Sequence, residues 1–230
     1  MVSLGNPHLV AHFRRAFAED PRAAFRDWYV LQEHLRDDRG QPEASEAAAR
    51  ALASDLWDIR GTLVFSLKGE EGRNREEATF LHNLAVFFGS RGPAEDLSRS
   101  RLLFEESLNA GYGSGDLEAW ARLHHNRGNA LQNLARSVDD LRESVACYER
   151  ALTVRDGTRR IARGVTLQAL GLALRKLAEA EPDRRQERLA AAVSSFEESL
   201  SLRSEEKLER GMAETRAALT EARQAISSGC

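Results

Sequence analysis

The most constraining feature of the sequence is a short segment that recurs three times. Residues 104–108, 148–152 and 196–200 read Phe-Glu-Glu-Ser-Leu, Tyr-Glu-Arg-Ala-Leu and Phe-Glu-Glu-Ser-Leu. Each copy places an aromatic residue four positions before a leucine, and successive aromatics are 44 and 48 residues apart. The small residues upstream of the copies, and after the last one, are Ala85, Gly128, Gly171 and Ala218. The pattern predicts a repeated pair of helices whose final copy is cut to its first helix.

Such a repeat has a simple physical basis. One helical hairpin cannot bury its apolar face alone, so neighbouring hairpins stack and share a continuous core. A small residue on the first helix lets two backbones approach, and an aromatic residue on the second helix fills the space between hairpins. The sequence therefore predicts an all-α solenoid of helical hairpins over residues 75–230, ended by a terminal capping helix.

The N-terminal third of the chain does not show this repeat clearly. Capping residues followed by proline mark helix starts at Asn6-Pro7, Asp20-Pro21 and Gln41-Pro42. The apolar residues that could pack one of these helices on the next are Trp28, Tyr29, Leu31, Leu35 and Trp57. Because the end of a solenoid needs a cover, we interpret residues 1–74 as a helical cap or as degenerate repeats.

Composition favours helix throughout and excludes several classes of function. Alanine, leucine, glutamate and arginine dominate, and only five prolines occur; these common residues lose little rotamer freedom in a helix. The net charge is −3, so no global field attracts nucleic acid or an anionic membrane surface. No apolar stretch is long enough to span a membrane, and the first residues show no secretory signal. A cytoplasmic location is therefore expected.

The repeat resembles the tetratricopeptide repeat, in particular the longer-period form found in kinesin light chains. Residues 81–92 look like the first helix of such a unit, and residues 148–156 look like the second helix and its exit. The resemblance covers about residues 75–226. Arg127 stands where leucine is usual, and Ser100 and Ser107 replace alanines. The resemblance implies a non-catalytic adaptor or scaffold for a protein or peptide partner, with a tubulin-like cytoskeletal filament as one such partner.

No motif for catalysis, for a cofactor or for a metal is apparent. Residues 111–115, Gly-Tyr-Gly-Ser-Gly, lack the lysine and the preceding strand of a phosphate-binding loop. His124 and His125 are adjacent and diverge by about 100° on a helix, so they make poor joint ligands for zinc. Cys147 falls within an amphipathic helix and is expected to be a small buried residue. We therefore expect a protein that is not an enzyme and needs no cofactor.

The candidate binding residues lie on the first helix of each hairpin, which lines the concave face of a tetratricopeptide array. The resemblance implies that this face includes His82, Arg122, His125, Asn129, Gln132, Asn133, Gln168, Arg175 and Lys176, together with Thr79, Val165 and Leu172. Asparagine can bond a peptide backbone, and arginine or lysine can bind carboxylates. The alternative is that these polar residues lie on an exposed helix face and bind nothing, which we favour for His82 and His125.

A second candidate is a basic patch near residue 160. It consists of Arg155, Arg159, Arg160 and Arg163, with Asp156 as the only acid among them. The patch could dock an acidic surface, such as the acidic tail of a filament protein. A solvated entry to a helix is the simpler interpretation.

Two other functions are compatible with the same sequence. One is a regulatory sensor, in which the concave face binds a peptide signal. The other is an accessory subunit of an enzyme complex whose catalytic part lies on another chain. The identity of the partner, and the oligomeric state, do not follow from the residues.

Overall fold

The computed structural model describes residues 15, 19, 50, 53, 54, 56–58, 73–91, 93, 95–206 and 209–228. The chain divides into two compact units, Met1–Phe80 and Leu81–Cys230. This division falls within helix α4 (Arg73–Arg91), whereas the sequence placed the boundary at residue 74. The helix starts predicted at residues 6, 20 and 41, and the aromatic residues at 28 and 29, lie outside the described residues. In the first unit Ala53, Leu56, Ala78 and Phe80 are buried.

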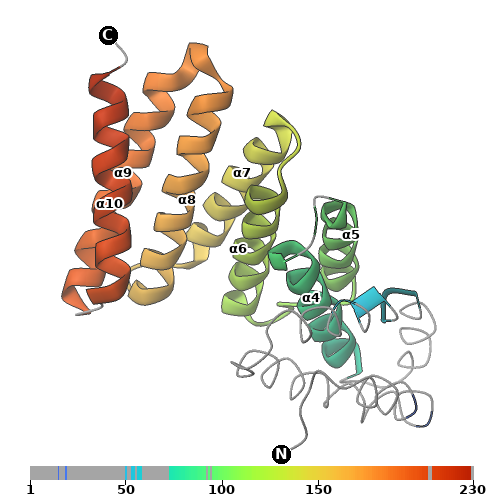
Figure 1. The fold of residues 1–230 in the computed structure, drawn as a ribbon. Coiled ribbons are helices and arrows are strands. Elements are labelled where there is room, and N and C mark those ends of the chain that lie inside the picture. The colour runs from blue at the N-terminus through green and yellow to red at the C-terminus, as the bar shows by residue number, and fades with distance from the viewer. Residues whose placement is uncertain are drawn as a thin grey trace, which may run out of the picture. The chain divides into compact units, whose positions relative to one another are not determined.

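The described residues form helices and no strand, which confirms the all-α prediction (Figure 1). After α4 come α5 (Asp96–Asn109), α6 (Leu117–Leu134), α7 (Val138–Val154), α8 (Arg160–Ala180), the 3-10 helix η1 (Pro182–Arg184), α9 (Arg185–Glu205) and α10 (Glu209–Ser227). Pro93 lies between α4 and α5, and Pro182 lies between α8 and α9. The predicted final single helix is α10.

Local sequence explains where the central helices begin. The Asp116 carboxylate accepts a hydrogen bond from the backbone N–H of Ala119 and caps α6. Ser137 and Asp140 form a reciprocal capping box at the start of α7. Between α5 and α6 the chain turns through Gly111, Gly113 and Gly115, all with positive φ. A Cβ on Gly113 would lie 2.7 Å from the Trp120 backbone, so this turn is packed against α6.

Helices of the second unit pack in the order of the chain. Each of α5 to α9 contacts the α-helix that follows it, and α6 also contacts α8, as α8 contacts α10. Successive helices from α6 to α10 run in opposite directions (Figure 1). The second unit is therefore built from helical hairpins, α6 with α7 and α8 with α9, followed by a single helix.

In both complete hairpins the small residue of the first helix lies against the aromatic ring of the second helix, whereas the sequence predicted that this ring lies in the space between hairpins. A Cβ built on Gly128 would lie 2.7 Å from the Tyr148 ring, and one on Gly171 would lie 2.5 Å from the Phe196 ring. Both rings are fully buried. Only glycine lets the first helix approach the aromatic ring of the second so closely. The same core contains Leu170, Leu174 and Leu177 of α8.

Buried serines add a second link between paired helices. The Ser100 hydroxyl donates to the Ala85 carbonyl at 2.9 Å, and the Ser144 hydroxyl donates to the Gly128 carbonyl at 2.9 Å. Both serines are completely buried and occupy equivalent positions, four residues before an aromatic. A buried hydroxyl must be paired. Ser100, a departure from the alanine that the resemblance leads us to expect, is therefore bonded across the helix pair.

Candidate functional site

The predicted binding residues fall at equivalent positions on α6 and α8, and we call the surface that they form the first-helix face. Counted from Gly128 and Gly171, its positions are Arg122, His125, Asn129 and Asn133 on α6 and Val165, Gln168, Leu172 and Lys176 on α8. Steps of three or four residues place each set on one side of its helix. The two helices are joined by Thr166 Oγ1 to His125 Nδ1 at 3.3 Å and by Lys176 Nζ to the Gln132 carbonyl at 3.0 Å.

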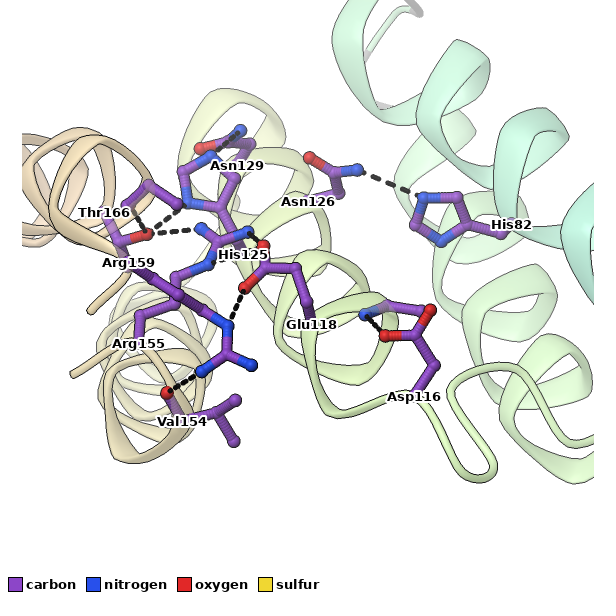
Figure 2. Close-up of polar contacts among 12 residues, drawn as sticks. His82, Asp116, Glu118, His125, Asn126, Asn129, Val154, Arg155, Arg159 and Thr166 are labelled. Atoms are coloured by element: carbon purple, nitrogen blue, oxygen red, sulfur yellow. Dashed lines mark hydrogen bonds and ion pairs between the residues drawn. The ribbon is translucent and has the colours of Figure 1, made fainter.

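His125 lies at the centre of a polar network that links α6 to α8 (Figure 2). The Thr166 hydroxyl donates to the Ala162 carbonyl at 2.9 Å, so its oxygen accepts from His125 Nδ1–H. His125 Nε2, 3.2 Å from the Asn129 amide nitrogen, is then the acceptor from that amide. Burial, and secondarily the charge of Arg155, lowers the pKa of His125 to about 4. The ring is neutral at pH 7, as these two hydrogen bonds require.

The hydroxyl of Tyr148 extends this network into the core. It lies 2.7 Å from Asn129 Oδ1 and 2.8 Å from Gln132 Oε1, and its proton is available to either oxygen. Burial raises the pKa of Tyr148, so the hydroxyl keeps its proton at any ordinary pH. Gln132 is buried. The single proton bonds one of these oxygens at a time, so Asn129 and Gln132, both predicted to bind a partner, share one internal hydrogen bond.

Arg155 also belongs to this polar network and is not a surface residue. Its guanidinium lies 2.7 Å from Glu118 Oε1 and 2.6 Å from Thr166 Oγ1, and the residue is 5% exposed (Figure 2). The sequence assigned Arg155 to an exposed basic patch, and this assignment is wrong. Glu118, the acid that pairs with it, lies 37 residues away in the chain and was not recognised. Only the fold brings the two together.

The other three arginines of the predicted patch also have acidic partners. Arg159 lies 3.5 Å from Glu118, and Arg163 lies 2.6 Å from Glu198. Arg160 forms an ion pair with Glu205. These three side chains are half-buried. Their charges are compensated by glutamates from α6 and α9, so the four arginines join helices and do not form an uncompensated basic surface.

The predicted residues of α8 divide into internal links and exposed groups. Gln168 accepts a hydrogen bond of 2.5 Å from Arg203, and Arg175 pairs with Glu221 of α10 at 2.7 Å. Lys176 is exposed, and the one acceptor of its ammonium group among the described residues is the carbonyl of Gln132. Lys176 therefore links α6 to α8 and keeps donors for another group.

His82 of α4 occupies the same position relative to Ala85 as His125 does to Gly128. Its ring stacks on Tyr112 with centroids 4.3 Å apart. Its Nε2 lies 3.1 Å from the Asn126 amide (Figure 2). Burial, and then the charge of Arg122, lowers the pKa of His82 to about 3. His82 and His125 are therefore structural residues that are bonded within the protein, whereas the interpretation favoured from the sequence placed them on an exposed helix face. Tyr112 is half-buried against His82.

Two predicted residues of the first-helix face have side chains whose polar groups are all available to a partner. Arg122 and Asn133 are exposed, and neither forms an ion pair or a side-chain hydrogen bond with any residue that the structure describes. On α8, near the level of Arg122, Val165 is 40% exposed and Ile161, one turn earlier, is 52% exposed. Sequence reasoning missed Ile161, although its spacing of four residues from Val165 was a usable signal. The face thus combines a free cation, a free amide and exposed aliphatic side chains.

Within the described part of the chain, no group of three or more histidine, cysteine, aspartate or glutamate residues could hold a metal ion. His124 packs edge-on against Trp120, away from the contacts of His125. Cys147 is buried in α7, as predicted, and burial raises the pKa of its thiol to about 11. No described helix is long and apolar enough to cross a membrane.

Comparison with known proteins leaves the chain without an assigned family. No family model matches it, and no significant similarity to a curated protein or to a solved structure is found. The arguments for function therefore depend on the geometry of the chain itself.

Proposed function

We propose that this protein is a non-catalytic scaffold of the tetratricopeptide type, which binds a protein partner through the first-helix face. The proposal is supported by the periodic packing of the second unit. The same contact between glycine and an aromatic ring recurs in two successive hairpins, and alternate helices α6, α8 and α10 touch one another in series. Stacked hairpins of this kind leave the first helices on a common surface.

The observation that carries the proposal is that Arg122 and Asn133 on α6, and Val165 and Ile161 on α8, are all exposed. A solvated helix face needs no exposed aliphatic side chains, whereas an interface combines apolar contacts with a few polar groups that fix orientation. The polar network beneath this face is internally bonded, so it holds α6 and α8 in register. A rigid scaffold with a mixed surface is suited to binding.

Site-specific photo-crosslinking in the native cell tests this proposal. A photoreactive amino acid replaces Asn133 on the first-helix face of the full chain. We expect it to form a discrete crosslink to a protein. The matched control replaces Glu149, which is exposed on α7. Substitution of Arg122 by glutamate in the Asn133 chain is expected to reduce the crosslink.

The comparison of the two positions decides the outcome. A crosslink from Asn133 that is absent from Glu149 supports binding at the first-helix face. Equal crosslinking from both positions, or crosslinking from Glu149 alone, contradicts the assignment of this face.

A further inference from the structure

Charge is segregated between the two kinds of helix in the second unit. Helices α6 and α8 together carry six basic residues and two acidic ones. Helices α7 and α9 carry five basic residues and eight acidic ones. The overall charge of −3 conceals this division. The first helices are therefore the cationic side of a protein that is acidic as a whole, and they favour an acidic partner.

Two cations on the first-helix face are not compensated. Arg122 and Lys176 are exposed, and neither forms an ion pair with a residue that the structure describes. By contrast, Arg155, Arg160, Arg163 and Arg175 all pair with glutamates. The face therefore has two specific positions at which a carboxylate from outside would gain a charge-assisted hydrogen bond.

The separation of these cations along the helix axes follows from helix geometry. The bond between Thr166 and His125 places Arg122 close to the level of Val165, and the bond between Lys176 and the Gln132 carbonyl fixes the other end. About ten residues of helix separate the two levels, which corresponds to about 15 Å at 1.5 Å per residue. An extended peptide rises about 3.3 Å per residue, so about five residues span this distance.

Apolar surface lies between the two cations. Val165 is 40% exposed near the level of Arg122, and Leu172 is half-buried between Val165 and Lys176. In an extended peptide, residues one, three and five point to the same side. The first and fifth can therefore meet the two cations while the third contacts the aliphatic side chains of α8.

From this arrangement we propose that the first-helix face binds an extended acidic segment with two carboxylates four positions apart and an aliphatic residue midway between them. Arg122 binds one carboxylate, Lys176 binds the other, and Val165 and Leu172 contact the central side chain. This inference rests on the proposed function, because it names the chemistry of the partner at the same face. It adds a charge, a spacing and a central residue that the proposed function does not require.

Binding of synthetic peptides to the full chain, measured by fluorescence anisotropy, tests the inference. The probe carries Glu-Ser-Leu-Ser-Glu within flanks of serine and glycine. We expect it to bind at least about ten-fold more tightly than Gln-Ser-Leu-Ser-Gln, since two charge-assisted bonds are lost in the second peptide. Moving the two glutamates to adjacent positions should also weaken binding, because one cation is then out of reach.

Charge reversal on the protein gives a sharper test. Arg122→Glu and Lys176→Glu are each expected to lower the affinity for the acidic probe by about ten-fold or more. Replacement of one glutamate of the probe by lysine should restore the affinity of these variants. The matched control is Arg150→Glu, at an exposed arginine on α7. It changes the net charge equally and should leave affinity within about two-fold, because α7 lies outside the face. Thermal melting of each variant verifies that the fold is retained.

Equal affinity for the acidic and amide probes would overturn the inference. So would a loss of affinity in Arg150→Glu as large as that in Arg122→Glu and Lys176→Glu. The failure of this inference is distinguishable from that of the proposed function. If crosslinking from Asn133 captures a partner while the acidic probe shows no preference, the face binds proteins of another chemistry. If both fail, the face itself is not a binding site.

Discussion

The hairpins α6–α7 and α8–α9 use the same packing contact and differ in what surrounds it. In both, a glycine of the first helix lies against an aromatic ring of the second. In α6–α7 the ring is Tyr148, whose hydroxyl joins Asn129 and Gln132. In α8–α9 the ring is Phe196, which has no hydroxyl, and the position equivalent to Asn129 is the apolar Leu172. The first hairpin therefore has polar bonds around this contact, whereas the second has an apolar side chain at the position of Asn129.

Each hairpin also has a buried arginine, and the partners of this arginine differ between the two hairpins. Arg155 and Arg203 each lie seven residues after the aromatic of their hairpin, and both are buried. Arg155 pairs with Glu118, whereas the hydrogen bonds of Arg203 go to the neutral side chains of Ser199 and Gln168. Burial lowers the pKa of Arg203, against the opposing charge of Glu214. The hydrophobic contact is thus shared by the repeats, while the polar bonds around it are particular to each.

The largest expected effect tests the shared contact. Phe196→Ala and Tyr148→Ala remove fully buried rings and are each expected to lower the free energy of unfolding by about 3–5 kcal/mol. Tyr148→Phe keeps the ring and loses the hydroxyl that serves Gln132, so we expect a cost of about 1–2 kcal/mol. Chemical denaturation of the full chain measures these differences. If Tyr148→Phe costs as much as Tyr148→Ala, the polar network, and not the ring, is the principal contact of the first hairpin.

The two buried arginines provide the next test. Arg155→Met leaves Glu118 with the longer, 3.5 Å contact to Arg159, so it is expected to cost about 2–3 kcal/mol, less than for a fully buried pair because Glu118 is partly exposed. Arg203→Met removes a cation that burial disfavours, and we expect a smaller cost of about 1 kcal/mol. Denaturation of both variants under the same conditions gives the comparison. An equal cost for the two would show that the ion pair with Glu118 contributes no more than neutral hydrogen bonds.

A third prediction concerns the closest approach in the core. In Gly171→Ala the added methyl group would meet the Phe196 ring, and overpacking should outweigh the gain in helix propensity by about 1–2 kcal/mol. Gly157→Ala is the matched control, because a Cβ there meets no atom within 4 Å. Thermal denaturation distinguishes the two. A stabilised Gly171→Ala variant would mean that the helices are free to separate at this point.

The smallest expected effect depends on pH and also separates the two hairpins. The folded-state pKa of His125 is about 4, below its unfolded value of about 6.5. Between these values the unfolded chain binds a proton that the folded chain does not, so stability falls as the pH is lowered from 7 towards 4. His125→Gln, which places in α6 the residue that α8 has at Gln168, should reduce this slope by up to about 1.4 kcal/mol per pH unit.

The difference in slope between the unmodified chain and His125→Gln, measured between pH 7 and pH 5, isolates the effect of His125, because His82 and His124, whose pKa values burial also lowers, contribute to both slopes. The carboxyl groups of Asp140 and Glu181 have lowered pKa values and stay ionised in this range. If the dependence of stability on pH is the same in His125→Gln, then His125 is protonated at the same pH in the folded and the unfolded chain.

The repeated core was predictable because its signal is local and periodic. The spacing of Gly128 from Tyr148, and of Gly171 from Phe196, depends only on the lengths of two helices and the turn between them. The pairing of Arg155 with Glu118, and the stacking of His82 on Tyr112, were not predictable. Both join residues at least 30 positions apart through long side chains or a loop, and their geometry depends on how neighbouring helices lie against each other.

The candidate site was predictable in part for the same reason. Helical spacing identified which residues share the first-helix face, including Arg122, Asn133, Val165 and Lys176. It could not tell which of them are engaged internally, as Gln132 and Gln168 are. A polar residue looks the same in the sequence whether its partner is a neighbouring helix or another molecule.

The sequence by itself determined that the described chain is helical, where its helices break, and which small and aromatic residues meet in the core. These properties follow from backbone propensity and from the period of apolar residues, which act over short distances along the chain. The tertiary structure alone decided which charges are compensated and which remain free. Ion pairs and hydrogen bonds require an approach of about 3 Å between side chains from different helices, and only the packing of those helices sets that distance.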